Sequence, residues 1–73
     1  MNEDKIQILC DENGYNSAEQ LAEDYMNDGV VPGICMNDDC DFTAEYEPDQ
    51  DKGWCEICET NSVFSLYVLM GII

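Results

Sequence analysis

Two close pairs of cysteines constrain the fold of this chain more than any other feature of its sequence. Cys35 and Cys40 form the first pair, and Cys55 and Cys58 form the second, after an intervening stretch of fourteen residues. Two such pairs can bring four thiolates to one tetrahedral ion, because each pair presents its sulfurs from a single tight turn. The pattern therefore predicts a four-cysteine metal site of the zinc-ribbon type.

Zinc (one structural Zn2+) is the metal that we expect at these four cysteines. Four thiolates are soft ligands, and a closed four-sulfur site leaves no open position for water or substrate, which is typical of a structural zinc ion. Iron on the same four sulfurs is the alternative, and it would make the protein a rubredoxin-like electron carrier. Cys10, the fifth cysteine, lies in a helical pattern and is expected to be a buried thiol rather than a ligand.

Two disulfide bonds are the competing use of these cysteines. Disulfides need an oxidising compartment, which proteins usually reach with a secretory signal. The chain begins with the acidic stretch Met1-Asn2-Glu3-Asp4, without the basic and apolar regions of a signal peptide. We therefore expect a cytoplasmic protein whose cysteines bind a metal.

The chain length sets the scale of the fold. A chain of 73 residues allows one domain with a small core, the size at which a metal commonly supplements hydrophobic burial. We expect a single α+β domain over residues 1–73. Its parts are a helical hairpin at 1–29, a zinc ribbon at 30–60 and an apolar C-terminal segment at 61–73.

Local signals place two helices in the N-terminal part. Apolar residues at helical spacing predict a helix over about residues 3–13, ended by Gly14. Ser17 is a typical N-cap for a second helix from Ala18 to about Asn27, and Gly29 would stop it. This second helix lacks basic side chains, so we do not expect it to read DNA.

The residues around the cysteines predict a ribbon. Pro32 and Gly33 indicate a tight turn that leads into Cys35. Alternating apolar residues at 42–46 predict a strand, and a turn at 48–53 would return the chain to Trp54 as a hairpin. We expect Trp54 to pack on Phe42 or Tyr46 and keep water from the thiolates; an exposed, partner-binding tryptophan is the alternative.

The C-terminal segment, residues 61–73, is apolar on nearly all sides. It is shorter than the roughly 20 residues that span a bilayer, so we do not expect a transmembrane helix. Its composition suits a helix or a strand, and we favour the helix. We expect it to supply most of the apolar area, packing on Ile6, Leu9, Leu21 and Tyr25, and any surplus apolar face would suit a homodimer or a larger partner.

Acidic residues dominate the charge of the chain. Seventeen aspartates and glutamates stand against Lys5 and Lys52, giving a formal net charge of −15. Such a charge opposes direct binding to nucleic-acid phosphates or to an anionic membrane. It suits either simple solubility or a protein partner with a basic surface.

A resemblance adds to these observations. The stretches 32–37, 40–41, 45–51 and 53–61, which include both cysteine pairs, are similar to a small zinc-ribbon family of aquatic bacteria and their phages that has no assigned activity. The resemblance implies a four-cysteine metal site on a two-part protein. One departure is Glu59, which follows the last cysteine where many zinc knuckles have a left-handed glycine; it would cost roughly 1 kcal/mol in that geometry.

Catalysis is the class of function that the residues support least. The chain has no histidine and no glycine-rich phosphate loop, and we expect no enzyme. The function that we expect is a protein–protein interaction module, a phage-related modulator of a basic host protein. The alternatives are an acidic nucleic-acid mimic that inhibits a nucleic-acid-binding protein and the iron electron carrier.

Overall fold

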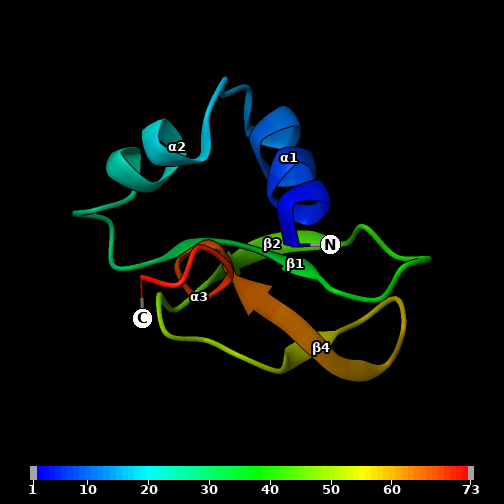
Figure 1. The fold of residues 1–73 in the computed structure, drawn as a ribbon. Coiled ribbons are helices and arrows are strands. Elements are labelled where there is room, and N and C mark those ends of the chain that lie inside the picture. Colours follow the sequence, from blue (N-terminus) through cyan, green and yellow to red (C-terminus); the bar gives the residue numbers. More distant parts are fainter. Residues whose placement is uncertain (1, 73) are drawn as a thin grey trace.

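The computed structural model describes residues 2–72 as an α+β fold of three helices and one four-stranded antiparallel sheet (Figure 1). The helices are α1 (Asn2–Asn13), α2 (Ala18–Asp24) and α3 (Leu66–Leu69). The strands are β1 (Val31–Cys35), β2 (Thr43–Tyr46), β3 (Gly53–Cys55) and β4 (Thr60–Ser65). The expected α+β class is confirmed. None of the helices within residues 2–72 has the length and apolar character needed to cross a bilayer.

Helices α1 and α2 form the expected hairpin and lie over one side of the sheet (Figure 1). Gly14 ends α1 with a φ of +76°, a left-handed conformation that glycine adopts without a steric cost. The Ser17 hydroxyl caps α2 by accepting a hydrogen bond from the backbone N–H of Gln20 at 3.3 Å. Helix α2 is shorter than predicted, because the N–H groups after Asp24 bond to carbonyls three residues back and tighten the last turn.

The sheet has the strand order β2-β1-β4-β3, which places β2 and β3 at opposite edges. The predicted hairpin between the strand at 42–46 and Trp54 is therefore wrong, since β3 pairs with β4. The two edges still approach each other, because the Tyr46 hydroxyl of β2 donates a hydrogen bond to the Trp54 carbonyl of β3 at 3.1 Å. The sheet is curled around the Tyr46 ring. A Cβ atom on Gly33 of β1 would lie 2.7 Å from that ring, so the curl requires glycine there.

Residues 31–35 form the strand β1, not the tight turn that Pro32 and Gly33 suggest. Backbone N–H groups of odd-numbered residues such as Cys35 bond towards β2, and those of even-numbered residues such as Met36 bond towards β4. Pro32 would donate on the β4 side, where β4 has already ended at Ser65. A proline is tolerated in this inner strand because no ladder bond is needed at that position.

The C-terminal segment divides into a strand and a short helix, where we favoured a helix throughout. Strand β4 lies between β1 and β3, and Ser65 then caps α3 by accepting a hydrogen bond from the Val68 N–H at 3.2 Å. Leu66 and Leu69 of α3 are buried among the apolar side chains between the helices and the sheet.

Within residues 2–72, the buried apolar side chains form two clusters rather than one core. The first, between the helices and the sheet, is built on Leu9, Cys10, Leu21, Ala22, Ile34, Leu66 and Leu69, with Ile6 and Tyr25 packed against it. The four residues on which we expect the C-terminal segment to pack all belong to this cluster or its margin, as do Leu66 and Leu69. The second cluster contains three of the paired cysteines and Val63, with Phe42, Tyr46 and Cys58 at its margin.

Candidate metal centre

The strands deliver the four paired cysteines to one point. Cys35 is the last residue of β1 and Cys55 the last residue of β3, while Cys40 and Cys58 lie in the loops that follow these strands. Their four sulfur atoms all lie within 4.8 Å of one another. Strand pairing explains the convergence, because β1 and β3 flank β4 and end at the same side of the sheet, as antiparallel neighbours of one strand must.

The spacing of the sulfurs fits a four-thiolate ion site. The Sγ atoms of Cys35 and Cys58 are 3.9 Å apart, and those of Cys40 and Cys55 are 3.7 Å apart. A tetrahedral ion with metal–sulfur bonds of about 2.3 Å holds its sulfurs roughly 3.8 Å apart. All five cysteines are free thiols, and the two distances are far longer than the roughly 2 Å of a disulfide bond. The arrangement is therefore compatible with metal binding by all four residues.

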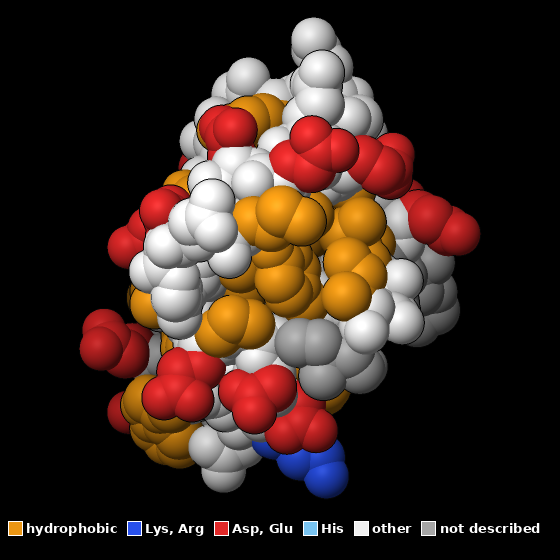
Figure 2. Space-filling view, turned by 90° about the vertical axis from the view of Figure 1, so that its left-hand side faces the viewer, with side chains coloured by type: hydrophobic (Ala, Val, Ile, Leu, Met, Phe, Trp, Pro, Cys, Tyr) orange, Lys and Arg blue, Asp and Glu red, His pale blue; other side chains and the backbone are white. Residues whose placement is uncertain are grey.

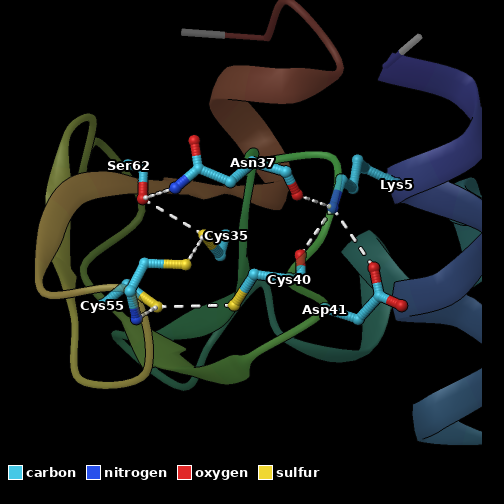
Figure 3. A network of polar contacts seen from close by, with 8 residues as sticks. Lys5, Cys35, Asn37, Cys40, Asp41, Cys55 and Ser62 are labelled. Atoms are coloured by element: carbon cyan, nitrogen blue, oxygen red, sulfur yellow. Dashed lines mark hydrogen bonds and ion pairs between the residues drawn. The ribbon is translucent and has the colours of Figure 1, made fainter.

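The protein surrounds these sulfurs with hydrogen bonds (Figure 3). The Ser62 hydroxyl lies 3.1 Å from the Cys35 sulfur, and the side-chain amide of Asn37 donates to the same hydroxyl at 3.4 Å. The Cys58 N–H donates to the Cys55 sulfur at 3.4 Å. Donors of this kind stabilise thiolates and orient them towards a metal.

Lys5 reaches the first cysteine loop from α1. Its ammonium group donates to the carbonyl oxygens of Asn37 and Cys40, each at 2.7 Å, and pairs with the Asp41 carboxylate at 3.2 Å (Figure 3). Only 7% of Lys5 is exposed. One of the two basic side chains of the chain therefore holds the loop between Cys35 and Cys40 against the helical hairpin.

The thiols oppose one another's ionisation. Burial raises the pKa of the Cys35 thiol, but hydrogen bonds from Ser62, from the Asn37 N–H and from neighbouring cysteines outweigh it and lower this pKa to about 7. A hydrogen bond from the Phe42 N–H lowers the pKa of Cys40, but burial and the other three cysteines dominate and raise it to about 12. Negative charge therefore concentrates on one sulfur in the free thiols, whereas a bound cation would stabilise four thiolates together.

Trp54 and Glu59 are chain neighbours of Cys55 and Cys58. Trp54 does not pack beside the thiolates: 51% of it is exposed. Successive residues of a strand point to opposite faces, so the inward direction of Cys55 turns Trp54 outward. Glu59 has a left-handed φ of 56°, the conformation that many zinc knuckles give to a glycine at this place, and its N–H donates to the Cys55 carbonyl at 2.8 Å.

Lys5 and Ser62 have contacts at this centre that the sequence did not indicate. A helical pattern marks Lys5 only as a residue of an acidic, solvated helix, and a serine in an apolar segment carries no ligand signal. Cys10, in contrast, lies outside the site as predicted, because it is buried in the helical cluster.

Comparison of the chain with protein-family models, with curated proteins and with solved structures gave no match.

Proposed function

We propose that the four cysteines bind one structural zinc ion and that the protein acts as a non-enzymatic zinc-ribbon module. The convergence of four sulfurs within 4.8 Å carries the metal part of this proposal. Zinc is the favoured ion because it binds four thiolates tetrahedrally and needs no open coordination position. With the sulfurs already close to that geometry, the metal adds its binding energy to the folded state, which is valuable in a chain with two small clusters.

Metal analysis tests this part. Native mass spectrometry and elemental analysis of protein from cells grown without added metal should show one zinc per chain. Replacing any of the four ligands with serine should abolish that stoichiometry, while Cys10→Ser should keep it, because Cys10 lies in the other cluster. Red protein that contains iron would favour the electron carrier instead. A colourless protein without metal, with a native melting curve, would contradict both readings.

We also propose that this module binds a protein with a basic surface. The support is the net charge of −15 and the exposure of carboxylates around the first cysteine loop and the turn before β3, such as Asp38, Asp39, Asp49 and Asp51. Acidic surfaces accelerate encounters with basic partners. The second candidate function is an acidic nucleic-acid mimic. In that case the same acidic surface would bind a nucleic-acid-binding protein.

A pull-down from lysate tests the interaction. The tagged protein should retain a basic protein at low salt and lose it as the Debye length falls from about 10 Å to about 3 Å between 0.1 M and 1 M salt. Changing the four exposed aspartates to asparagine should weaken capture with little effect on melting; Asp41 stays unchanged because it pairs with Lys5. Release of the captured protein by competing DNA would identify the mimic. Capture that is independent of both salt and these substitutions would overturn the electrostatic proposal.

A further inference from the structure

An open groove lies between α2 and the segment from α3 to Ile72. Its volume is about 290 Å³, and its apolar lining comes from Ala22, Met26, Tyr67, Met70 and Ile72. Figure 2 shows apolar side chains gathered at the centre of this face of the molecule, with acidic side chains around them. We call this feature the methionine groove, because two of the four methionines of the chain line it.

The frame of the methionine groove is held by hydrogen bonds. The Tyr67 hydroxyl of α3 donates to the Ala22 carbonyl of α2 at 2.9 Å, which fixes one wall to the other. The end of α3 is closed by bonds from the Gly71 N–H to the Val68 carbonyl and from the Ile72 N–H to the Tyr67 carbonyl, the pattern of a Schellman motif. The backbone around the groove is therefore set before a ligand arrives, while methionine side chains can adapt to different shapes.

Two large apolar side chains of the groove face solvent. Met26 is 71% exposed and Ile72 is 57% exposed. They lie with Met70 around one hollow instead of being scattered singly over the surface. Clustered exposed apolar side chains of this kind mark interaction surfaces more often than isolated ones do. A volume of about 290 Å³ can hold a few apolar side chains.

The charge around the groove selects among the possible occupants. Glu19 and Glu23 of α2 line it, and the whole chain carries −15. A second copy docking by two-fold symmetry would bring these glutamates towards their own counterparts and would add like charges. Anionic lipid would be repelled in the same way. A segment that combines apolar side chains with lysines or arginines is complementary both to the apolar lining of the groove and to the carboxylates of Glu19 and Glu23.

We infer that the methionine groove binds a basic amphipathic helix of the partner protein. Such a helix would insert apolar side chains at i, i+3 or i+4, and i+7 between Met26, Met70 and Ile72, and would place basic side chains against Glu19 and Glu23. This inference rests on the proposed function and deepens it, because it names the surface and the partner segment. Charge alone would allow any basic protein to bind. The apolar lining of the groove also requires that the partner segment carry apolar side chains along one face of a helix.

A designed peptide is the direct probe. A peptide of leucine and lysine, about 18 residues or five helical turns long, would carry its leucines on one helical face. The first control rearranges the same residues so that leucines and lysines alternate, and the second replaces lysine with glutamate. Fluorescence anisotropy should show the patterned peptide binding at least about tenfold more tightly than either control. Equal affinity for the patterned and rearranged peptides would overturn the inference.

Matched substitutions locate the binding surface. Met26→Ser and Ile72→Ser should each weaken peptide binding by about tenfold. Ile57→Ser is the control, because Ile57 is also 71% exposed but lies outside the groove. The double substitution Glu19→Gln with Glu23→Gln should weaken peptide binding and reduce its dependence on salt. The matched control is Glu45→Gln with Glu47→Gln, which changes the net charge by the same amount at exposed residues outside the groove. Each variant should retain its metal and its melting temperature, because these side chains are exposed.

The outcomes separate this inference from the proposed function. If the groove variants bind the peptide normally while the aspartate variants still lose the basic protein from lysate, the groove inference fails and the acidic interaction module stands. If neither set changes any binding, both fail. Sedimentation that shows a dimer broken by Met26→Ser, or binding to zwitterionic phosphatidylcholine vesicles that is lost in the same variant, would assign the groove to a second copy or to lipid and would overturn the basic-helix inference.

Discussion

The Nζ atom of Lys5 lies 2.7 Å from the carbonyl oxygen of Cys40, which joins the first helix to the first cysteine loop. The contact links residues that are 35 positions apart in the chain. It also connects the two clusters, since Lys5 is on α1 and Cys40 belongs to the cluster of sulfurs. One buried ammonium group therefore joins the helical hairpin to the first loop of the proposed metal site.

Substitution of Lys5 by methionine should lower the free energy of unfolding by about 2 kcal/mol. The variant keeps most of the side-chain length but leaves the carbonyl oxygens of Asn37 and Cys40 without this donor, and a buried acceptor that loses its partner costs roughly 1–3 kcal/mol. Chemical denaturation of the metal-loaded protein measures the change.

Lys52→Met is the control for Lys5→Met, because it removes the same charge from an exposed residue. We expect this control to change stability by less than about 0.5 kcal/mol. Asp41→Asn should cost up to about 1 kcal/mol, since it weakens only an ion pair whose carboxylate is exposed. If Lys5→Met and Lys52→Met had equal effects, the role of the buried hydrogen bonds would be refuted.

Substitution of Ser62 by alanine should weaken metal binding without abolishing it. The hydroxyl lies 3.1 Å from the Cys35 sulfur and favours its thiolate, and loss of such a supporting contact commonly costs about tenfold or more in metal affinity. Titration against a chromophoric chelator measures the affinity. Ser17→Ala, which removes a helix cap outside the cysteine cluster, should leave the affinity unchanged.

The effect of Ser62→Ala should depend on pH. The hydrogen bond lowers the pKa of Cys35, to about 7 in the native chain, so its loss raises this pKa. Protons then compete with the metal more strongly near and below pH 7, whereas both proteins present the thiolate well above the raised value. We expect the difference in affinity between variant and native protein to be larger at pH 6.5 than at pH 9. A difference that grew with rising pH would contradict this assignment.

Substitution of Glu59 by glycine should stabilise the protein by about 0.5–1 kcal/mol. Glu59 has a left-handed φ of 56°, which costs a residue with a Cβ atom roughly 1 kcal/mol or more, and the gain is reduced by the greater freedom of glycine in the unfolded chain. Glu59→Ala removes the same charge but retains the Cβ atom. Thermal melting that showed equal gains for both variants would attribute the effect to charge and not to backbone conformation.

Leu66→Ala should destabilise the protein by about 2–5 kcal/mol, because Leu66 is completely buried in the helical cluster. Met70→Ala, in the same segment but only half-buried at the margin of that cluster, should cost clearly less. Denaturant unfolding of both variants, each with its metal, compares them. If Leu66→Ala lowered the free energy of unfolding as little as Met70→Ala, α3 would contribute less to the core than its burial indicates.

Local chemistry accounts for what could be predicted from the sequence. The spacing of the cysteines is a property of two short turns, so the convergence of the four sulfurs could be predicted from the sequence. The C-terminal end of α1 and the start of α2 follow from Gly14 and Ser17, whose conformational preferences do not depend on distant residues.

Longer-range relationships account for the errors. Pro32 and Gly33 belong to a strand only because β4 ends beside Pro32 and the Tyr46 ring lies over Gly33. Neither condition is visible in neighbouring residues. The same is true of the pairing between β3 and β4 and of the burial of Lys5, which depends on carbonyl groups more than 30 positions away. Val63 and Phe64 have good strand propensity within a segment that also suits a helix, and β1 decides between the two by pairing with them.

The strand order has a consequence for how the chain assembles. Pairing of β1 with β4 joins Cys35 to Val63, and such distant pairing is slow because a long loop must close first. A metal held by both cysteine pairs would close that loop before the strands align. Folding of the sheet should then accelerate with the supply of metal, so that the ion governs the rate at which newly made chains mature as well as the stability of the finished protein.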